Sequence, residues 1–202
     1  MNKAKTVCVP GDPNVALKPI TESESVDSVP YREAVGSLMF LAIVSRPDIS
    51  FAVNNASKFL NNHDSNHWRA VKRIFAYLLG TANFGIVYRS GGSESNLIGF
   101  SDADYAADLE TRRSTTGYLF CLSGGPVTWS SKRQKSIALS TTEAEYVALS
   151  LAGKEATWLR VLLRDIEYQC ENPTVIHVDN QSAIRLAKNP EFHQRTKHID
   201  VC

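Results

Sequence analysis

The chain has 202 residues, of which 43% are hydrophobic and 21% are charged, so it can bury one sizeable core and a smaller companion unit. This composition excludes collagen-like, coiled-coil and intrinsically disordered proteins. A net charge of +1 argues against a generic polyanion binder, although residues 31–90 carry 7 basic and 3 acidic groups and residues 91–202 carry 12 and 14. Four widely spaced cysteines without a C-x-x-C pair predict free thiols.

Residues 1–30 are rich in proline and polar residues and are expected to form an extended or disordered leader. The sequence contains neither the roughly 20 consecutive apolar residues of a membrane span nor the apolar stretch of a signal peptide. We therefore expect no membrane contact and a location in the cytoplasm, with the nucleus as the alternative compartment.

Three helical patterns follow in residues 31–80. The first runs through residues 33–45, and the second begins near Pro47, which suits a first helical turn. The third has apolar residues at spacings of three and four after a cap at Asp64 or Ser65. A small three-helix unit is the predicted result.

From residue 81 the apolar pattern changes from helical to alternating, which is typical of strands. Strands are predicted over residues 84–88 and 96–102. A β-hairpin is predicted over residues 115–131, with a Gly-Gly-Pro turn in its middle. These segments would form three or four adjacent strands.

A long helix is predicted from Thr141 to about Ile166, followed by a buried strand over residues 174–179 and a short helix that opens at Asn180 or Ser182. The resulting order is βββαβα. The residues expected on the apolar face of the long helix are Ala144, Val147, Ala148, Leu151, Ala152, Ala156, Leu159 and Leu162.

Four acidic residues lie at ends of predicted elements, where side chains can converge above a sheet. Asp102 closes a strand, Glu143 lies in the first turn of the long helix, Asp179 ends the next strand, and Asp200 lies near the end of the chain. Each alone has an ordinary explanation as a turn residue or as a partner of a helix dipole. Together they favour a site for hard divalent cations such as magnesium, because clustered carboxylates repel one another without a cation.

Two neighbouring acids complicate this assignment. Asp104 would share the strand face of Asp102 and is kept as a candidate accessory group. Glu145 lies two residues beyond Glu143 and therefore points well away round the helix. We prefer Asp102 and Glu143 as site residues and interpret Glu145 as a surface residue.

The runs SDADYAAD, STTEAEY, VDNQSA and KHIDV resemble the ribonuclease H domain of copia-type long-terminal-repeat retrotransposon polyproteins. Upstream, YREAVGSLMFLAIVSRPDISFAV and HWRAVKRIFAYLLGT are similar to the thumb and connecting region that precede this domain. The resemblance covers roughly Tyr31 to Cys202. It implies an α/β fold with a ribonuclease H-like mixed sheet over residues 81–202, in which the C-terminal helix is truncated, preceded by a helical thumb-like unit over residues 31–80.

Carried onto matching positions, the resemblance implies that Asp102, Glu143, Asp179 and Asp200 hold two Mg²⁺ ions, for which Mn²⁺ can substitute. The implied reaction is hydrolysis of the RNA strand of an RNA/DNA hybrid. His198 is a candidate proton carrier, because histidine titrates near neutrality. A reverse transcriptase palm domain is the partner expected in the full polyprotein.

Basic residues near the predicted site offer contacts to a nucleic-acid backbone. One such cluster is formed by Lys132, Arg133 and Lys135. An ordinary solvated surface explains this cluster equally well. The resemblance implies recognition of the 2′-hydroxyl and of the hybrid shape rather than of base sequence.

Two other functions are alternatives to a ribonuclease. A transposase or integrase core also uses carboxylates on such a sheet, but its acids resemble the order Asp, Asp, Glu, whereas here the glutamate comes second. A catalytically inactive polyprotein fragment that at most binds nucleic acid stays open, because the chain stops two residues after Asp200, before the helix that would buttress it. The sequence predicts no oligomeric state.

Overall fold

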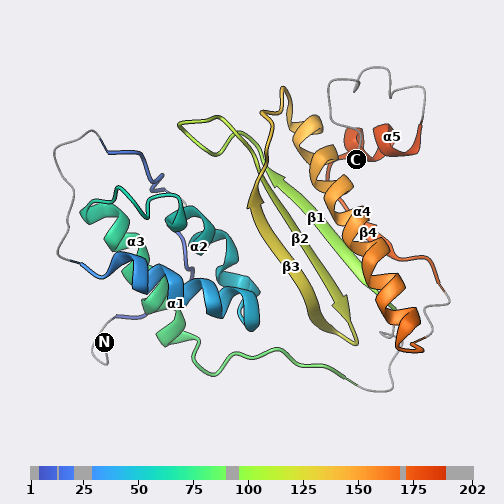
Figure 1. Cartoon of the computed structure of the whole chain (residues 1–202), viewed down its shortest axis with the longest axis horizontal. Coiled ribbons are helices and arrows are strands. Elements are labelled where there is room, and N and C mark those ends of the chain that lie inside the picture. Colours follow the sequence, from blue (N-terminus) through green and yellow to red (C-terminus); the bar gives the residue numbers. More distant parts are fainter. Residues whose placement is uncertain (1–4, 13, 21–28, 90–95, 169–171, 190–202) are drawn as a thin grey trace. The chain divides into compact units, whose positions relative to one another are not determined.

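The computed structural model of the chain comprises two compact units, Met1–Gly85 and Ile86–Cys202, which we call the helical unit and the sheet unit (Figure 1). None of the described helices is long and apolar enough to cross a membrane. The structure describes residues 5–12, 14–20, 29–89, 96–168 and 172–189.

The helical unit contains the three helical segments that the sequence predicts. The elements are α1 (Tyr31–Val44), the 3-10 turn η1 (Pro47–Ile49), α2 (Ser50–Ser57) and α3 (Ser65–Gly80). Helix α3 begins after the predicted cap Asp64, whose side chain accepts hydrogen bonds from the backbone N–H groups of Asn66 and His67. Such a cap satisfies donors that the first helical turn leaves free.

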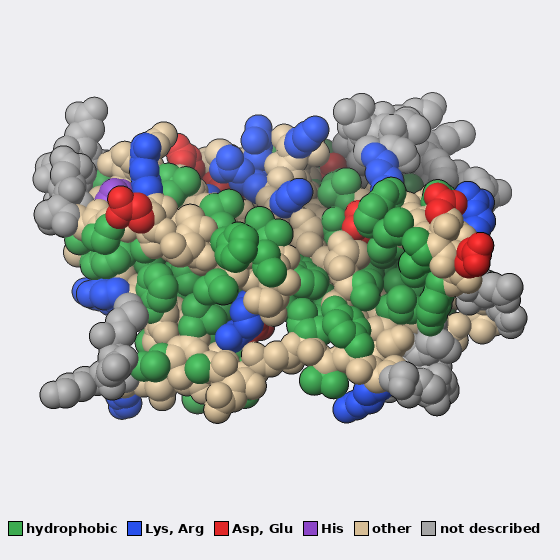
Figure 2. Space-filling view, turned by 60° about the horizontal axis from the view of Figure 1, so that its bottom comes forward, with side chains coloured by type: hydrophobic (Ala, Val, Ile, Leu, Met, Phe, Trp, Pro, Cys, Tyr) green, Lys and Arg blue, Asp and Glu red, His purple; other side chains and the backbone are tan. Residues whose placement is uncertain are grey.

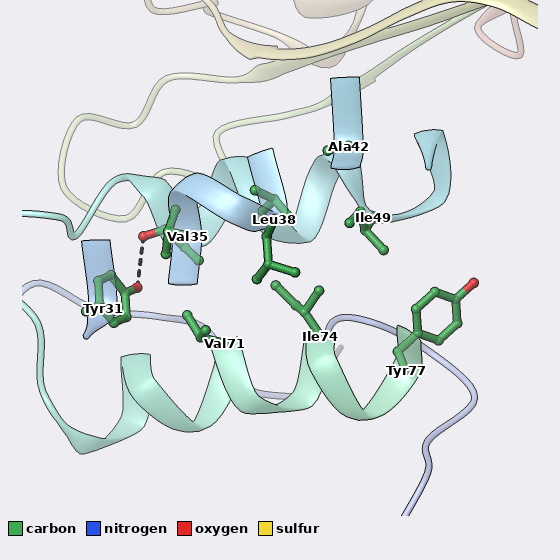
Figure 3. Packing of buried hydrophobic residues seen from close by; sticks show 10 residues of the cluster. Tyr31, Val35, Leu38, Ala42, Ile49, Val71, Ile74 and Tyr77 are labelled. Carbon is green, nitrogen blue, oxygen red and sulfur yellow. Dashed lines mark hydrogen bonds between the residues drawn. The ribbon is translucent and has the colours of Figure 1, made fainter. Parts of the chain in front are cut away.

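One apolar core holds the helical unit together (Figure 3). Leu38 of α1 and Ile74 of α3 point toward each other and are almost fully buried. The hydroxyl of Tyr31 donates a hydrogen bond to the backbone carbonyl oxygen of Ala56 at 2.9 Å, which ties α1 to α2. Val7, in the expected leader, packs against this core, so part of residues 1–30 contacts the helices.

Apolar side chains also lie on the molecular surface, as Figure 2 shows for one face. In the helical unit they include Phe40 and Ile43 of α1, and in the sheet unit they include Leu139 and Trp158. Exposed apolar side chains are normal on folded proteins, so their exposure alone assigns no role.

The sheet unit contains a four-stranded mixed sheet in the order β3-β2-β1-β4. Its strands are β1 (Ile98–Asp104), β2 (Thr115–Leu122), β3 (Gly125–Arg133) and β4 (Val175–His177). Strand β1 pairs antiparallel with β2 and parallel with β4. The long helix α4 (Thr141–Asp165) packs on β1 and β2 and is followed, after β4, by α5 (Gln181–Lys188) (Figure 1). The predicted mixed α/β class and the βββαβα order are confirmed.

The core of the sheet unit lies between the sheet and α4. Phe120 of β2 is fully buried there and packs with Ala152 and Leu159 of α4. Gly99 of β1 lies directly against the ring of Phe120, and a Cβ at this glycine would lie 2.5 Å from the ring. The close approach of strand and aromatic ring therefore requires a glycine at this position.

The predicted hairpin is present, and its turn consists of Ser123 and Gly124. Both residues have positive φ angles, 54° and 77°, as a two-residue turn that matches the strand twist requires. The following Gly125 and Pro126 belong to β3. Proline is tolerated there because β3 is an edge strand of the four that the structure describes.

Two strand predictions need correction. The segment 84–88 is not a strand: it runs past the hairpin turn, where the Arg89 N–H donates to the Ser123 carbonyl oxygen at 2.8 Å. Its apolar side chains, such as Val87, are exposed, so apolar alternation does not mark a packed face here. Strand β4 is shorter than predicted and not buried, since Val175 is 54% exposed.

Candidate active site

Three carboxylates from separate elements meet at one end of the sheet. Asp102 lies in β1, Glu145 in α4, and Asp179 between β4 and α5. One carboxylate oxygen from each residue lies within 4.8 Å of the other two. We call these three residues the carboxylate group.

The parallel pairing of β1 and β4 explains why the two aspartates meet. Phe100 of β1 lies opposite His177 of β4, and their rings stack at a centroid distance of 5.1 Å. Asp102 and Asp179 each follow two residues later along neighbouring parallel chains. Because parallel strands end at the same edge of a sheet, the two side chains arrive at the same place. The structure thus brings together Asp102 and Asp179, two of the four acids that the sequence analysis singled out.

Glu145 completes the group from the second turn of α4. The helix starts at a cap in which the Ser140 hydroxyl accepts a hydrogen bond from the Glu143 N–H at 3.1 Å. The stripe of α4 that packs on the sheet contains Ala144, Ala148 and Ala152, which are fully buried. Their small side chains let the helix backbone approach the sheet closely. Glu145 lies on the same side of the helix and is only 7% exposed.

The pKa of the Glu145 carboxyl is raised to about 7. Burial is the largest cause, followed by the negative charge of Asp102 and then by that of Asp179, which opposes ionisation less strongly. A hydrogen bond with the backbone of Ala103 acts in the opposite direction but does not compensate. The group therefore contains a carboxylate that is held beside like charges.

The interpretation of Glu145 as a surface residue is wrong, and Glu143 is not a member of the carboxylate group. The Oε2 atom of Glu143 instead accepts a hydrogen bond from the Leu139 N–H at 2.8 Å, in the loop before the helix. The two glutamates point to different sides of α4, as the sequence predicts. The alanines at intervals of four are visible in the sequence, but the larger apolar residues Val147 and Leu151 beside them left open which side of α4 faces the sheet.

The remaining predicted site residues lie elsewhere or outside the described residues. Asp104 of β1 pairs in register with Thr115, and its carboxylate is not part of the group. Asp200 and His198 lie outside the residues that the structure describes.

The carboxylate group has the chemistry of a site for a hard divalent cation. All three side chains offer carboxylate oxygens, the donors that magnesium and manganese prefer. The Oε2 atom of Glu145 is buried and has no hydrogen-bond partner among the described residues. Buried polar atoms are normally paired. A cation would both coordinate this oxygen and offset the repulsion among the acids, so the residues present fit such an ion.

The predicted basic cluster lies toward the same end of the sheet. Arg133 ends β3 and lies in register with Thr115, which pairs with Asp104. Its guanidinium forms an ion pair with the buried carboxylate of Asp108 at 3.0 Å. Lys132 and Lys135 are exposed. Arg133 thus has a structural partner, whereas the two lysines are accessible to a ligand.

Comparison with known proteins shows strong similarity to polyproteins of transposons. The chain is 48% identical over 182 residues to the retrovirus-related Pol polyprotein from transposon TNT 1-94 of Nicotiana tabacum, a match that covers 90% of this chain and 14% of the polyprotein. It is 42% identical over 201 residues to the corresponding polyprotein from transposon RE1 of Arabidopsis thaliana. This match covers 100% of this chain and 14% of that polyprotein. No protein-family model matches the chain.

A shorter relative is the secreted RxLR effector protein 161 of Plasmopara viticola. It is 50% identical over 137 residues, which are 68% of this chain and 96% of that protein. Among solved structures, the foamy viral protease-reverse transcriptase in complex with dsDNA matches 90% of this chain and 37% of its own. Its TM-score is 0.40, and the two chains are 15% identical.

The sequence comparisons identify the family of this chain. The two polyproteins match almost the whole length of the chain at more than 40% identity, and the chain spans only 14% of each of them. The chain belongs to the retrovirus-related Pol polyproteins of copia-type transposons.

Proposed function

We propose that this chain is the ribonuclease H part of its polyprotein and hydrolyses the RNA strand of an RNA/DNA hybrid. The observation that carries the proposal is the carboxylate group of Asp102, Glu145 and Asp179 at one end of the mixed sheet. Its position matches the runs SDAD, STTEAEY and VDNQSA, on which the resemblance to such domains rests. The proposed cofactors are two Mg²⁺ ions, with Mn²⁺ as a substitute.

Asp102, Glu145 and Asp179 would hold the ions, and Asp200 is the fourth acid that the sequence offers. When bound, divalent cations supply a Lewis acid that activates water and neutralises the charge of the scissile phosphate. The side chains themselves supply negative charge in a fixed arrangement, since Glu145 is buried and both aspartates are anchored by neighbouring parallel chains. This arrangement would orient the reacting phosphate without a large reorganisation of the protein.

Glu145 links this function to pH. Its raised pKa, about 7, means that near neutrality its carboxyl is partly protonated in the absence of a cation. A cation and a proton compete for the same oxygens. Cation affinity should therefore rise with pH through this range, and binding should release a proton.

Two exposed lysines near the carboxylate group could contact the phosphates of the hybrid. Lys132 and Lys135 lie toward the same end of the sheet as the carboxylate group and are accessible for phosphate contacts. Selection of the RNA strand would come from the 2′-hydroxyl and from the shape of the hybrid. In the full polyprotein, a reverse transcriptase palm domain would present the hybrid.

The proposal is tested by cleavage of a labelled RNA strand annealed to DNA, with Mg²⁺, Mn²⁺ or chelator. The Asp179→Asn variant and an all-RNA duplex serve as controls. We expect cation-dependent cutting of the hybrid alone, which is lost in the variant while its circular dichroism spectrum is unchanged. A folded chain that does not cut would contradict the proposal and favour the alternative of an inactive fragment that at most binds nucleic acid.

A further inference from the structure

Gln134 is a buried amide at the junction of two strands and the long helix. It directly follows β3 and is 4% exposed. Its backbone N–H donates to the Ser114 carbonyl oxygen at 2.8 Å, just before β2 begins. Its side-chain Nε2 donates to Thr116 Oγ1 at 3.0 Å and to the Ala144 carbonyl oxygen at 2.9 Å. One side chain thus connects β2 to the start of α4.

Both partners of this amide are next to residues of the carboxylate group. Ala144 is fully buried and immediately precedes Glu145. Thr116 lies opposite Ala103 in the β1–β2 register, and Ala103 immediately follows Asp102. The two hydrogen bonds of Gln134 therefore constrain the helix turn that carries Glu145 relative to the strand pair that carries Asp102.

The orientation of the amide is determined by its partners. A carbonyl oxygen can only accept a hydrogen bond, so the nitrogen of Gln134 must face the Ala144 carbonyl oxygen. The Oε1 atom of Gln134 is then left buried without a hydrogen-bond partner among the described residues. An unpaired buried oxygen lowers stability. An apolar side chain of similar length would remove this unpaired oxygen, but it would also take the donor away from the Thr116 hydroxyl and the Ala144 carbonyl oxygen.

We propose that Gln134 is a positioning residue that holds the first turns of α4 against β2 and thereby keeps Glu145 beside Asp102. Through this placement it sets the affinity of the carboxylate group for divalent cations. The step from placement to cation affinity rests on the proposed function. The placement itself does not, because it concerns the cation-free chain.

The placement is tested by hydrogen–deuterium exchange on the cation-free full chain. In Gln134→Met, the backbone amides of residues 144–148 should exchange about tenfold faster than in the wild type, while those of the second half of α4 keep their rates. The thermal unfolding midpoint should change little, because methionine fills the same space. Equal exchange at residues 144–148 in the two proteins would overturn the proposal.

The effect on the carboxylate group is tested by calorimetric titration with MnCl₂. Gln134→Met should bind Mn²⁺ with an apparent Kd raised at least about tenfold, in the range found when residues that orient metal ligands are lost. The matched control is Thr128→Val, which removes a different hydrogen bond between the sheet and α4, from the Thr128 hydroxyl to Glu155 Oε1 at 2.7 Å. Glu155 lies ten residues after Glu145, so this control should bind Mn²⁺ like the wild type.

The two measurements separate the possible failures. If the wild type does not bind Mn²⁺, the proposed function fails and the exchange data still decide the placement. If the wild type binds and Gln134→Met binds equally well, the inferred control of cation affinity is overturned. If Gln134→Met does not fold, Thr116→Val serves in its place, because it leaves the Gln134 amide bonded only to Ala144. In Thr116→Val, exchange at residues 144–148 and the apparent Kd for Mn²⁺ should both rise about threefold. Unchanged exchange in that variant would contradict the placement.

Discussion

The Arg46–Asp48 ion pair of the helical unit and the carboxylate group of the sheet unit arrange charged side chains in opposite ways. In the helical unit, the guanidinium of Arg46 contacts the carboxylate of Asp48 at 2.7 Å, and the Nδ1 atom of His67 lies 2.6 Å from the carboxylate of Asp64. In the sheet unit, the acids of the carboxylate group lie together, and both charged neighbours that act on Glu145 are negative. Paired charges organise a fold, whereas a cluster of like charges costs stability and marks a site with another purpose.

The Arg46 network shows what paired charge does in the helical unit. The guanidinium of Arg46 donates to the Thr81 hydroxyl at 2.6 Å, at the end of α3, and to Asp48 in η1. The Tyr77 hydroxyl donates to the same carboxylate at 2.8 Å. Burial would raise the pKa of Asp48, but the hydrogen bonds from Arg46 and Tyr77 lower it on balance. The ionised carboxylate thus fastens η1 to α3.

The largest expected effect is on catalysis, and it distinguishes the two glutamates of α4. Glu145→Gln should reduce hybrid cleavage at least about 100-fold, because it removes a charged ligand from the carboxylate group. Glu143→Gln should stay within about threefold of the wild type, since glutamine keeps an oxygen acceptor for the Leu139 N–H. Initial cleavage rates at saturating Mg²⁺ give the comparison. The reverse order of rates would restore Glu143 as the site residue.

The same substitution should stabilise the cation-free chain at high pH. Because folding raises the pKa of Glu145 from 4.5 to about 7, ionisation of this group opposes folding, and stability falls as pH rises through that interval. Glu145→Gln should therefore raise the free energy of unfolding by about 3 kcal/mol at pH 8 and by almost nothing at pH 4.

Urea denaturation in chelator at the two pH values measures this difference. Glu143→Gln is the matched control, because its carboxylate lies outside the carboxylate group. Saturating Mn²⁺ should stabilise the wild type and leave Glu145→Gln nearly unchanged. If the wild type is as stable as Glu145→Gln at pH 8 in chelator, the clustered acids do not lower the free energy of unfolding.

Loss of a hydrogen-bonded carboxylate in the helical unit should act in the opposite direction. Asp64→Ala removes the acceptor of the Asn66 and His67 backbone N–H groups and should lower the free energy of unfolding by about 1–2 kcal/mol at pH 7. Burial would raise the pKa of Asp64, but its hydrogen bonds, chiefly from His67, lower it below 3.8. The contribution of the ionised form should therefore disappear as pH falls below that value. Asp64→Asn, which keeps an oxygen acceptor, should lose less.

The smallest effect is expected for the ion pair between the N-terminal segment and α3. Asp12 and Arg73 are 3.4 Å apart, and their side chains are partly exposed. Asp12→Asn should change the free energy of unfolding by less than about 0.5 kcal/mol, because solvent and salt screen such pairs. Thermal unfolding at low and high salt measures this. A loss as large as that of Asp64→Ala would mean that this ion pair contributes far more stability than a solvent-screened pair.

Local patterns were sufficient for most elements. The Asp64 cap and the spacing of apolar residues predicted α3, and the turn residues predicted the hairpin, because both depend on neighbours in sequence. The sequence pattern around Asp102 and Asp179 also placed both residues at the ends of strands. The segment 84–88 was wrongly predicted as a strand, because alternation is informative only when one face packs against something.

The choice between Glu143 and Glu145 needed the tertiary structure. Consecutive helix residues are about 100° apart, so the two side chains were known to diverge. The predicted apolar stripe contained the packed alanines and Leu159, but it also contained Val147, Leu151 and Leu162, which are not buried. Periodicity thus established α4 and its two candidate acids. The rotation of α4 about its axis was decided by contact with β1 and β2, because only residues small enough for close approach fit between helix and sheet.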